Sequence, residues 1–325
     1  MRVLVTYRHI PAKGLIDELR QAHETVVNPG DGYFDRSELK RHIADVDAVV
    51  CLPNEPIDAE LLDAAPRLKV IANYAVGYNN IDVHHATTRG VMVTNTPGVV
   101  TDATADMAWA LLMGLARHLR GADMFTRSGN WTVWRPEAFI ASDITGATLG
   151  IVGFGRIGQA VAKRAACFDM RVLYHDVRRP GPDVEQRYRA EYVGLDTLLR
   201  EADFVTLHVL LDRSTYHIIN AERLSLMKPS AYLINASRGP VVDEPALVQA
   251  LREKIIAGAG LDVYENEPQL TPGLAELDNV LLMPHLGANS NRTRDMMARI
   301  TVNNIAAALA GKRPPNLVNP EVWQG

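Results

Sequence analysis

This sequence has few cysteines, only a small excess of negative over positive charge, and no long apolar run. Each of these features excludes a class of protein. Two cysteines, Cys51 and Cys167, lie far apart in apolar surroundings, so we expect reduced core residues in a cytoplasmic protein rather than a disulfide framework. The formal net charge of −4 gives no broad basic field for nucleic acid or a membrane surface. The longest apolar run, residues 108–116, is about half a membrane span, and the N-terminal strand is too short for a signal peptide.

Several signatures of catalytic and metal sites are also missing. The chain has no Gly-x-Ser-x-Gly, Cys-x-x-Cys, His-Glu-x-x-His or Walker lysine motif, and no internal repeat or low-complexity tract. His84 and His85 are adjacent, so on a helix their side chains point apart, and we expect no metal site there.

The most informative pattern that is present is a glycine-rich turn. An apolar strand ending at Val152 runs into Gly153-x-Gly155-x-x-Gly158, and a helix begins near Arg156. Gly153 permits the tight turn, Gly155 lets the backbone approach a pyrophosphate, and Gly158 lets the helix pack closely on the strand.

The residues around this turn strengthen the interpretation. The helix N-terminus, with Arg156 and Ile157, supplies free N–H groups and a partial positive charge for phosphates. A second strand, residues 171–175, ends at Asp176, which can accept hydrogen bonds from a ribose diol. We therefore predict a dinucleotide site, most simply for NAD, in preference to a tight turn without a ligand.

Strands and helices alternate along the whole chain, which predicts parallel sheets covered by helices. We expect an α/β fold with two doubly wound parallel-sheet domains, one of them a Rossmann dinucleotide-binding domain. The last strand of the second sheet is expected near residue 283, yet a helix follows at 292–310, so the simplest topology returns that helix to the first domain. The smaller domain then comprises residues 1–100 plus 289–325, and the dinucleotide-binding domain comprises 101–288.

A long helix is expected to connect into the second domain. Thr101 is a suitable N-cap, and the helix should run to about Arg120. The segment is apolar on nearly every face, which predicts burial between domains or subunits. A loop rich in glycine, tryptophan and proline follows at residues 128–136.

Three polar residues follow the carboxyl ends of predicted strands in the second domain: Arg238, Glu267 and His285. Ligands of open α/β sheets bind outside those strand ends, so we expect the three side chains at one edge. Glu265 lies beside Glu267, and one of the two is expected to be a solvated loop charge. Taken singly, each residue has a structural explanation, such as a satisfied histidine or a surface ion pair.

Together these residue types suit hydride transfer to a 2-oxo acid. A histidine can protonate the ketone oxygen as hydride arrives, and a carboxylate beside it favours the imidazolium and fixes the ring. A guanidinium can hold the substrate carboxylate and polarise its carbonyl. The nicotinamide carries the hydride.

With these residues in place, the sequence closely resembles the D-2-hydroxyacid dehydrogenases over essentially its whole length. The motifs that carry the resemblance lie at residues 73–82, 95–106, 149–158, 235–244, 260–268 and 284–287. Within that family the chain is most similar to glyoxylate and hydroxypyruvate reductases. The resemblance implies reduction of glyoxylate to glycolate or of hydroxypyruvate to D-glycerate, a flavodoxin-like substrate domain and a homodimer.

The resemblance also assigns roles to residues. It makes Arg238, Glu267 and His285 the catalytic triad, and Val76 and Gly77 a backbone cradle for the substrate carboxylate, beside Arg238. It points to Trp134 as a residue that shapes the substrate site at a dimer interface, with Trp131 packing. The residues expected to contact the cofactor, besides the three glycines and Asp176, are Thr104, Arg156, Ile157, His208, Ala236, Ser237, Asp262, His285 and Gly287.

Several alternatives stay open at this point. Asp176 would repel a 2′-phosphate, which favours NAD, but Arg178 or Arg179 could reach that phosphate and so keep NADP possible. Phosphoglycerate dehydrogenase is a second enzyme candidate, although the extra C-terminal regulatory domain that many carry is absent. Formate dehydrogenase, which resembles this fold, has glutamine where Glu267 stands, and this difference argues against it. An NADH-sensing, corepressor-like binding module is the alternative outside enzymes.

Overall fold

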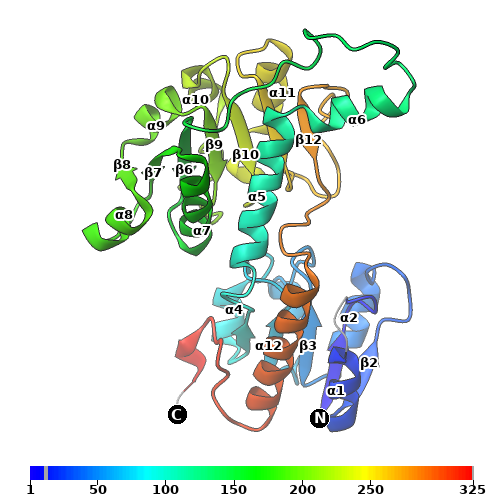
Figure 1. The fold of residues 1–325 in the computed structure, drawn as a ribbon. Helices are drawn as coiled ribbons and strands as arrows, with labels where there is room; N and C mark the ends of the chain where they lie inside the picture. Colours follow the sequence, from blue (N-terminus) through cyan, green and yellow to red (C-terminus); the bar gives the residue numbers. More distant parts are fainter. Residues whose placement is uncertain (11–13, 324–325) are drawn as a thin grey trace. The chain divides into compact units, whose positions relative to one another are not determined.

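The structure is a computed structural model that describes residues 1–10 and 14–323. Contacts divide the chain into two compact units, Met1–Val100 with Asn289–Gly325, and Thr101–Ala288 (Figure 1). Residues 11–13 and 324–325 of the expected smaller domain lie outside the described residues.

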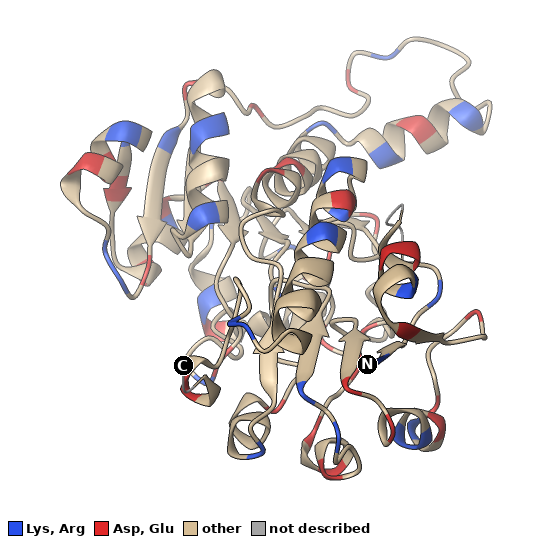
Figure 2. Cartoon of the chain, turned by 90° about the horizontal axis from the view of Figure 1, so that it is seen from below, with Lys and Arg blue, Asp and Glu red and all other residues tan. Residues whose placement is uncertain are grey.

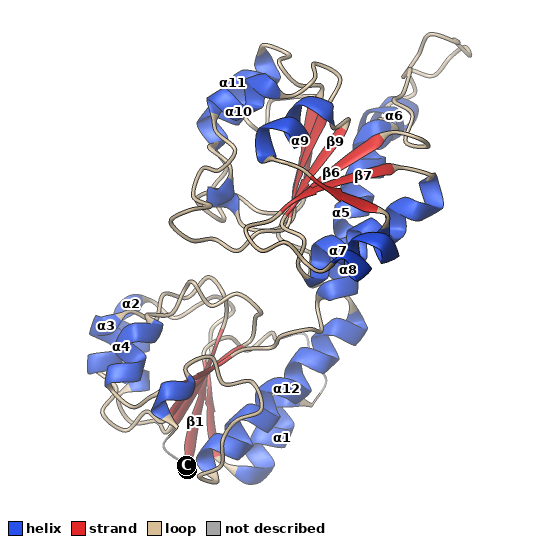
Figure 3. Ribbon diagram, turned by 90° about the vertical axis from the view of Figure 1, so that its left-hand side faces the viewer, coloured by secondary structure: helices blue, strands red, loops and turns tan. Residues whose placement is uncertain are grey.

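The first unit is built on a five-stranded parallel sheet in the order β2-β1-β3-β4-β5. Its strands are β1 (Arg2–Val5), β2 (Glu24–Val27), β3 (Ala48–Cys51), β4 (Val70–Asn73) and β5 (Met92–Thr94). Its helices are α1 (Leu15–Ala22), α2 (Arg36–Ile43), α3 (Ala59–Asp63), α4 (Val83–Thr88), α12 (Asn291–Leu309) and the 3₁₀ turn η3 (Pro320–Val322). Helices α2, α3 and α4 cover one face of the sheet and α1 and α12 the other (Figure 3). This strand order is that of flavodoxin-like folds.

The two ends of the chain meet in this unit through buried polar contacts. The Tyr74 hydroxyl, directly after β4, donates to the carbonyl oxygen of Arg294 in α12 at 2.8 Å. Asn319 is 2% exposed; its side chain accepts from the N–H of Val93 at 2.8 Å and donates to the carbonyl oxygen of Val91 at 2.9 Å. Because an unpaired buried polar group is costly, these bonds hold the C-terminal segment against the sheet.

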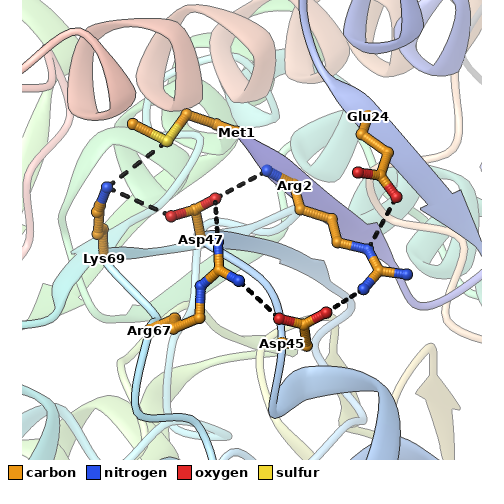
Figure 4. A network of polar contacts seen from close by, with 7 residues as sticks. All are labelled: Met1, Arg2, Glu24, Asp45, Asp47, Arg67 and Lys69. Carbon is orange, nitrogen blue, oxygen red and sulfur yellow. Dashed lines mark hydrogen bonds and ion pairs between the residues drawn. The ribbon is translucent and has the colours of Figure 1, made fainter.

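The amino ends of β1, β3 and β4 are tied by a network around Asp47 (Figure 4). Asp47 is 3% exposed and accepts from the Arg2 N–H at 2.8 Å, while Lys69 Nζ lies 3.3 Å from its other carboxylate oxygen. Burial alone would raise the pKa of Asp47, but the bond from Arg2 and the charges of Lys69 and Arg67 outweigh it and hold the pKa below its usual value.

We predict that Asp47→Asn lowers the free energy of unfolding by about 1–2 kcal/mol at pH 7. A depressed native pKa contributes stability above the unfolded pKa, so the difference from wild type should vanish as the pH falls through the native pKa of Asp47. Urea unfolding at several pH values measures it. Asp45→Asn, at an exposed carboxylate of the same network, is the control and should cost less than about 1 kcal/mol. An equal loss in both variants would contradict the prediction.

The second unit contains a seven-stranded parallel sheet in the order β12-β11-β10-β9-β6-β7-β8. Its strands are β6 (Thr148–Val152), β7 (Arg171–His175), β8 (Ala190–Tyr192), β9 (Phe204–Leu207), β10 (Tyr232–Asn235), β11 (Gly258–Leu261) and β12 (Val280–Leu282). Its helices are α5 (Thr101–Ala116), α6 (Leu119–Arg127), α7 (Arg156–Ala165), α8 (Pro182–Tyr188), α9 (Leu195–Glu201), α10 (Ala221–Leu226), α11 (Glu244–Arg252) and the turns η1 (Ala166–Phe168) and η2 (Gly239–Val241). This is the Rossmann order extended by one strand.

The predicted fold class, two doubly wound α/β sheets, is therefore confirmed. One hydrophobic cluster packs α9, α10 and α11 on one face of the second sheet, and another packs α5 and α7 on the other (Figure 3). Basic and acidic residues are interspersed over the helices of both units (Figure 2). Among the described residues, no helix combines the length and apolar character needed to cross a membrane.

Three local expectations are corrected by the structure. Helix α5 includes Thr101 instead of starting after it, and it stops at Ala116 because His118 takes a left-handed conformation with φ of 51° before α6 begins. Strand β8 was not predicted from the sequence. Cys51 is buried as expected, but Cys167 is exposed in the turn after α7, and both thiols are free.

Candidate active site

The glycine turn after β6 has the geometry that its sequence predicts. Gly153 has φ of +92°, and a Cβ there would lie 2.6 Å from the carbonyl carbon of His208. A Cβ at Gly158 would lie 2.2 Å from the carbonyl oxygen of Gly153, so only glycine allows α7 to start this close to the strand. At Gly155 an added Cβ would meet nothing within 4 Å, so the backbone faces open space where a ligand can approach.

Asp176 stands beside this turn at the end of β7. One carboxylate oxygen accepts from the N–H of Phe154 at 2.6 Å, and the other accepts from the N–H of Arg178 at 2.9 Å. The bond to Phe154 links the acidic residue to the turn itself. The first turn of α7 has no intrahelical acceptors for its N–H groups, including those of Arg156 and Ile157, so these groups are available to an anion.

His208 closes the other side of the turn. Its Nε2 lies 2.9 Å from the Thr206 hydroxyl, while its Nδ1 is buried and has no hydrogen-bond partner in the described part of the chain. Burial lowers the pKa of His208 to about 3, so the ring is neutral. The open backbone at Gly155, the free helix terminus and this orphaned nitrogen fit a dinucleotide with polar groups of its own.

Arg238 is positioned by the turn that ends β10. The side chain of Asn235 accepts from the Ser237 N–H at 3.0 Å and donates to the Arg238 carbonyl oxygen at 3.0 Å, which fixes residues 236–238. An Arg238 guanidinium N–H donates to the Ser237 carbonyl oxygen at 2.7 Å. Burial lowers the pKa of Arg238 and the charge of Glu267 opposes the shift, so the guanidinium stays charged in a low-dielectric position near that carboxylate.

Glu267 and His285 form a hydrogen-bonded pair from neighbouring strand ends. His285 Nδ1 lies 2.8 Å from one Glu267 oxygen, and the other oxygen accepts from the Tyr264 N–H at 3.0 Å. A carboxylate only accepts, so Nδ1 carries the proton and Nε2 is the ring atom left for a reacting group. The His285 side chain is 33% exposed and that of Glu267 is 17% exposed.

The charges of the pair support each other. Burial on its own would raise the pKa of Glu267, but the hydrogen bond and charge of His285, the Tyr264 N–H and the Arg238 charge outweigh it and hold the pKa below its ordinary value. Glu267 is therefore ionised at neutral pH, and its hydrogen bond orients the His285 ring.

The expectation that Glu265 or Glu267 is a solvated loop charge is wrong. Neither glutamate is a solvated loop charge, because the Glu265 side chain is 16% exposed and lies 2.7 Å from His217 Nε2. The Glu265 N–H donates to Glu244, which is itself 2% exposed. Each glutamate of this loop is thus paired with a histidine. Glu267 pairs with His285, which follows β12, whereas Glu265 pairs with His217, which follows β9.

Thr104, Asp262 and Gly287 come together at the same edge. Asp262 is 1% exposed, and its two oxygens accept from the N–H groups of Leu286 and Gly287 at 2.6 and 2.7 Å. The Thr104 hydroxyl lies 3.3 Å from the Gly287 carbonyl oxygen. These contacts shape the loop that follows His285, while Ala236 is 7% exposed and Ser237 9% exposed in the turn before Arg238.

In the first unit, Val76 and Gly77 lie in the loop after β4. The Asn95 side chain donates to the Val76 carbonyl oxygen at 2.8 Å, and the Asn73 side chain donates to the Gly77 carbonyl oxygen at 2.7 Å. Both carbonyls are thereby fixed, and in the described part of the chain neither amide donates a hydrogen bond. Two free, adjacent N–H groups are what an anion cradle requires.

Trp134 lies in the segment that follows α6. It is 74% exposed, and Trp131, expected to pack, is 59% exposed, so the single chain buries neither ring.

Sequence reasoning missed the residues that support the site. Asn235 and Asn73 each end a buried apolar strand, and a polar residue at that position is a usable signal. Tyr264, whose hydroxyl donates to the Met283 carbonyl oxygen at 2.8 Å, gives no such signal, because its partner is 19 residues away.

The fold, the glycine turn and the charged residues after β10, β11 and β12 define a dinucleotide-dependent α/β enzyme. Comparison with known proteins is more specific. Residues 109–287 match the family described as "D-isomer specific 2-hydroxyacid dehydrogenase, NAD binding domain". A protein named glyoxylate reductase from Thermococcus onnurineus is 53% identical over 325 residues, covering 99% of this chain and 96% of the relative.

Solved structures agree in fold over the full chain. A glyoxylate reductase from Paecilomyes thermophila superposes with a TM-score of 0.87 at 33% identity, covering 98% of both chains. An NADPH-dependent glyoxylate/hydroxypyruvate reductase from Sinorhizobium meliloti, in complex with NADP and malonate, gives 0.86 at 34% identity, covering 100% of this chain and 98% of that one. The chain belongs to the D-isomer-specific 2-hydroxyacid dehydrogenase family and is an NAD(P)-dependent dehydrogenase.

Proposed function

We propose that the protein reduces small 2-oxo acids to D-2-hydroxy acids, with glyoxylate as first substrate and hydroxypyruvate as second. The observation that carries this proposal is the 2.8 Å contact between His285 and Glu267, near the partly buried guanidinium of Arg238. Proteins named glyoxylate reductase that match nearly the whole chain at about half identity support the substrate class.

Each residue has a distinct task in this reaction. When bound at the glycine turn, the nicotinamide cofactor supplies the hydride. The doubly protonated His285 ring gives its Nε2 proton to the carbonyl oxygen as negative charge develops there and becomes neutral. Glu267 stabilises the protonated ring before this transfer and holds its orientation. Arg238 binds the carboxylate of the acid through its guanidinium. In the first unit, the free amides of Val76 and Gly77 form a second anion-binding group.

A panel of acids with both cofactors tests the proposal. Purified protein should give its highest kcat/KM with glyoxylate, followed by hydroxypyruvate, and lower values with pyruvate, phenylpyruvate and 3-phosphohydroxypyruvate. A preference for the phosphorylated acid would instead favour phosphoglycerate dehydrogenase, and NADH binding without turnover would favour a sensor.

We propose that the enzyme prefers NAD to NADP, because the Asp176 carboxylate is bonded to the Phe154 N–H of the glycine turn and would repel a 2′-phosphate bound there. Asp176→Ser should lower the ratio of kcat/KM for NADH to that for NADPH by about fivefold or more, because a close like charge costs on the order of 1 kcal/mol or more. An unchanged ratio would remove Asp176 from cofactor selection.

We propose a homodimer formed through the segment from α6 to residue 140. This segment exposes an unusual set of apolar side chains: Leu119, Met124, Trp131, Val133, Trp134, Phe139 and Ile140. A monomer rarely leaves this many large apolar side chains of one segment in water, and pairing two copies would bury them. Trp134 would then shape the substrate site from this interface. Analytical ultracentrifugation should give twice the chain mass, and a monomer at micromolar concentration would contradict the proposal.

We also propose a cytoplasmic location, because the two free thiols suit a reducing compartment. Cell fractionation tests it, and recovery from an oxidising compartment would oppose it.

A further inference from the structure

Arg179, in the loop after β7, is already bound by another residue. Its Nε lies 2.7 Å from Oε1 of Glu185 and its Nη2 lies 3.0 Å from Oε2, so the guanidinium and the carboxylate make two parallel bonds. The guanidinium carbon also lies 5.2 Å from the centre of the Tyr192 ring. A bidentate pair with an aromatic face fixes the direction of the arginine better than a single surface contact does.

Glu185 is itself held in place from the sheet. The hydroxyl of Tyr174, a fully buried residue of β7, donates to the Glu185 carboxylate, and the Glu185 side chain is only 16% exposed. The bonds from Arg179 and then Tyr174 lower the pKa of Glu185 to about 2, so the carboxylate is ionised at every physiological pH. Two strands, β7 and β8, thus anchor the glutamate and the ring that position Arg179.

The Arg179–Glu185 pair lies where it can affect the choice between NAD and NADP. Arg179 follows Asp176 by three residues, in the loop where a 2′-phosphate of NADP would lie. That phosphate needs a cation to offset the Asp176 charge, and a guanidinium is the side chain best shaped to supply it. In the described part of the chain the Arg178 side chain has no hydrogen bond or ion pair, whereas Arg179 is occupied.

We propose that Glu185 is a specificity-determining residue, which disfavours NADP by holding Arg179 away from the 2′-phosphate. This inference rests on the NAD preference proposed above and adds a second determinant to Asp176. Asp176 acts by repulsion, and Glu185 acts by keeping the compensating cation occupied. Removing the charge of Glu185 should therefore release Arg179 for the phosphate.

Cofactor binding to the full chain, measured by fluorescence titration without an acid substrate, tests the proposal. Glu185→Gln should lower the Kd of NADPH by about 3- to 10-fold and change the Kd of NADH by less than twofold. Adding Arg179→Gln should abolish the gain, while Arg179→Gln alone should leave NADPH binding within twofold of wild type. Such non-additivity marks two residues that act through one contact.

Glu191→Gln is the matched control, because Glu191 pairs with Arg171 at 3.0 Å at the opposite end of β7 and the substitution changes the net charge equally. It should leave both constants unchanged. The proposal is overturned if Glu185→Gln leaves NADPH binding unchanged, tightens both cofactors equally, or keeps its gain without Arg179. Because no acid is present, a wrong substrate assignment does not affect the result, and equal wild-type affinity for both cofactors would contradict only the NAD preference.

Discussion

His285→Asn is expected to reduce the kcat of glyoxylate reduction by about 10²- to 10⁴-fold while the protein still binds NADH. The variant removes the Nε2 proton that we assign to the carbonyl oxygen, and it removes the partner of Glu267. Asparagine is chosen because the residue has φ of 55°, which asparagine tolerates better than alanine, so the loop before Leu286 should keep its shape. Stopped-flow single turnovers and NADH titration measure the two quantities.

His217→Asn is the control for this experiment. His217 is also bonded to a glutamate, at 2.7 Å, and also has a left-handed conformation, with φ of 48°. Its loss should lower kcat by less than about fivefold. If both variants lose activity to the same extent, the effect belongs to the folding of the loop at residues 262–271 and not to proton transfer.

The glycine turn was predictable because each of its constraints is local. The strand, the three glycines, the helix and the acidic residue stand in one stretch of sequence, and each glycine answers to a steric limit that sequence spacing already contains. The fold class was predictable for a similar reason, since alternating apolar strands and helices admit few parallel arrangements.

Contacts over long sequence distances could not be predicted in the same way. Nothing near Glu265 shows that it faces His217, 48 residues earlier, and so is not solvated. The end of α5 depends on the left-handed conformation of His118, a residue type with no strong signal for it. Strand β8 has three residues, with no periodicity to detect, and is defined by its pairing with β7.

The determinants of cofactor preference likewise include one that is local in the sequence and one that depends on contacts between separate elements. Asp176 is visible in the sequence at the end of a strand, whereas the role of Arg179 depends on a glutamate in the next helix and on two tyrosines of separate strands. The sequence therefore left both arginines as candidates for a phosphate, and among the described residues Arg179, unlike Arg178, is paired with a carboxylate.

Arg238→Lys is expected to lower kcat/KM for glyoxylate by about 10²- to 10³-fold, although the positive charge is kept. The guanidinium is planar and can bind a carboxylate through two parallel bonds while polarising the adjacent carbonyl, and a lysine ammonium cannot do both. The loss should appear in KM and in kcat, because the acid is bound before the reaction and more negative charge develops during it. Arg223→Lys is the control, since Arg223 also donates to a backbone carbonyl oxygen, that of Ile218 at 2.8 Å, and should retain nearly full activity. Activity of Arg238→Lys within threefold of wild type would show that binding of the acid does not need the guanidinium.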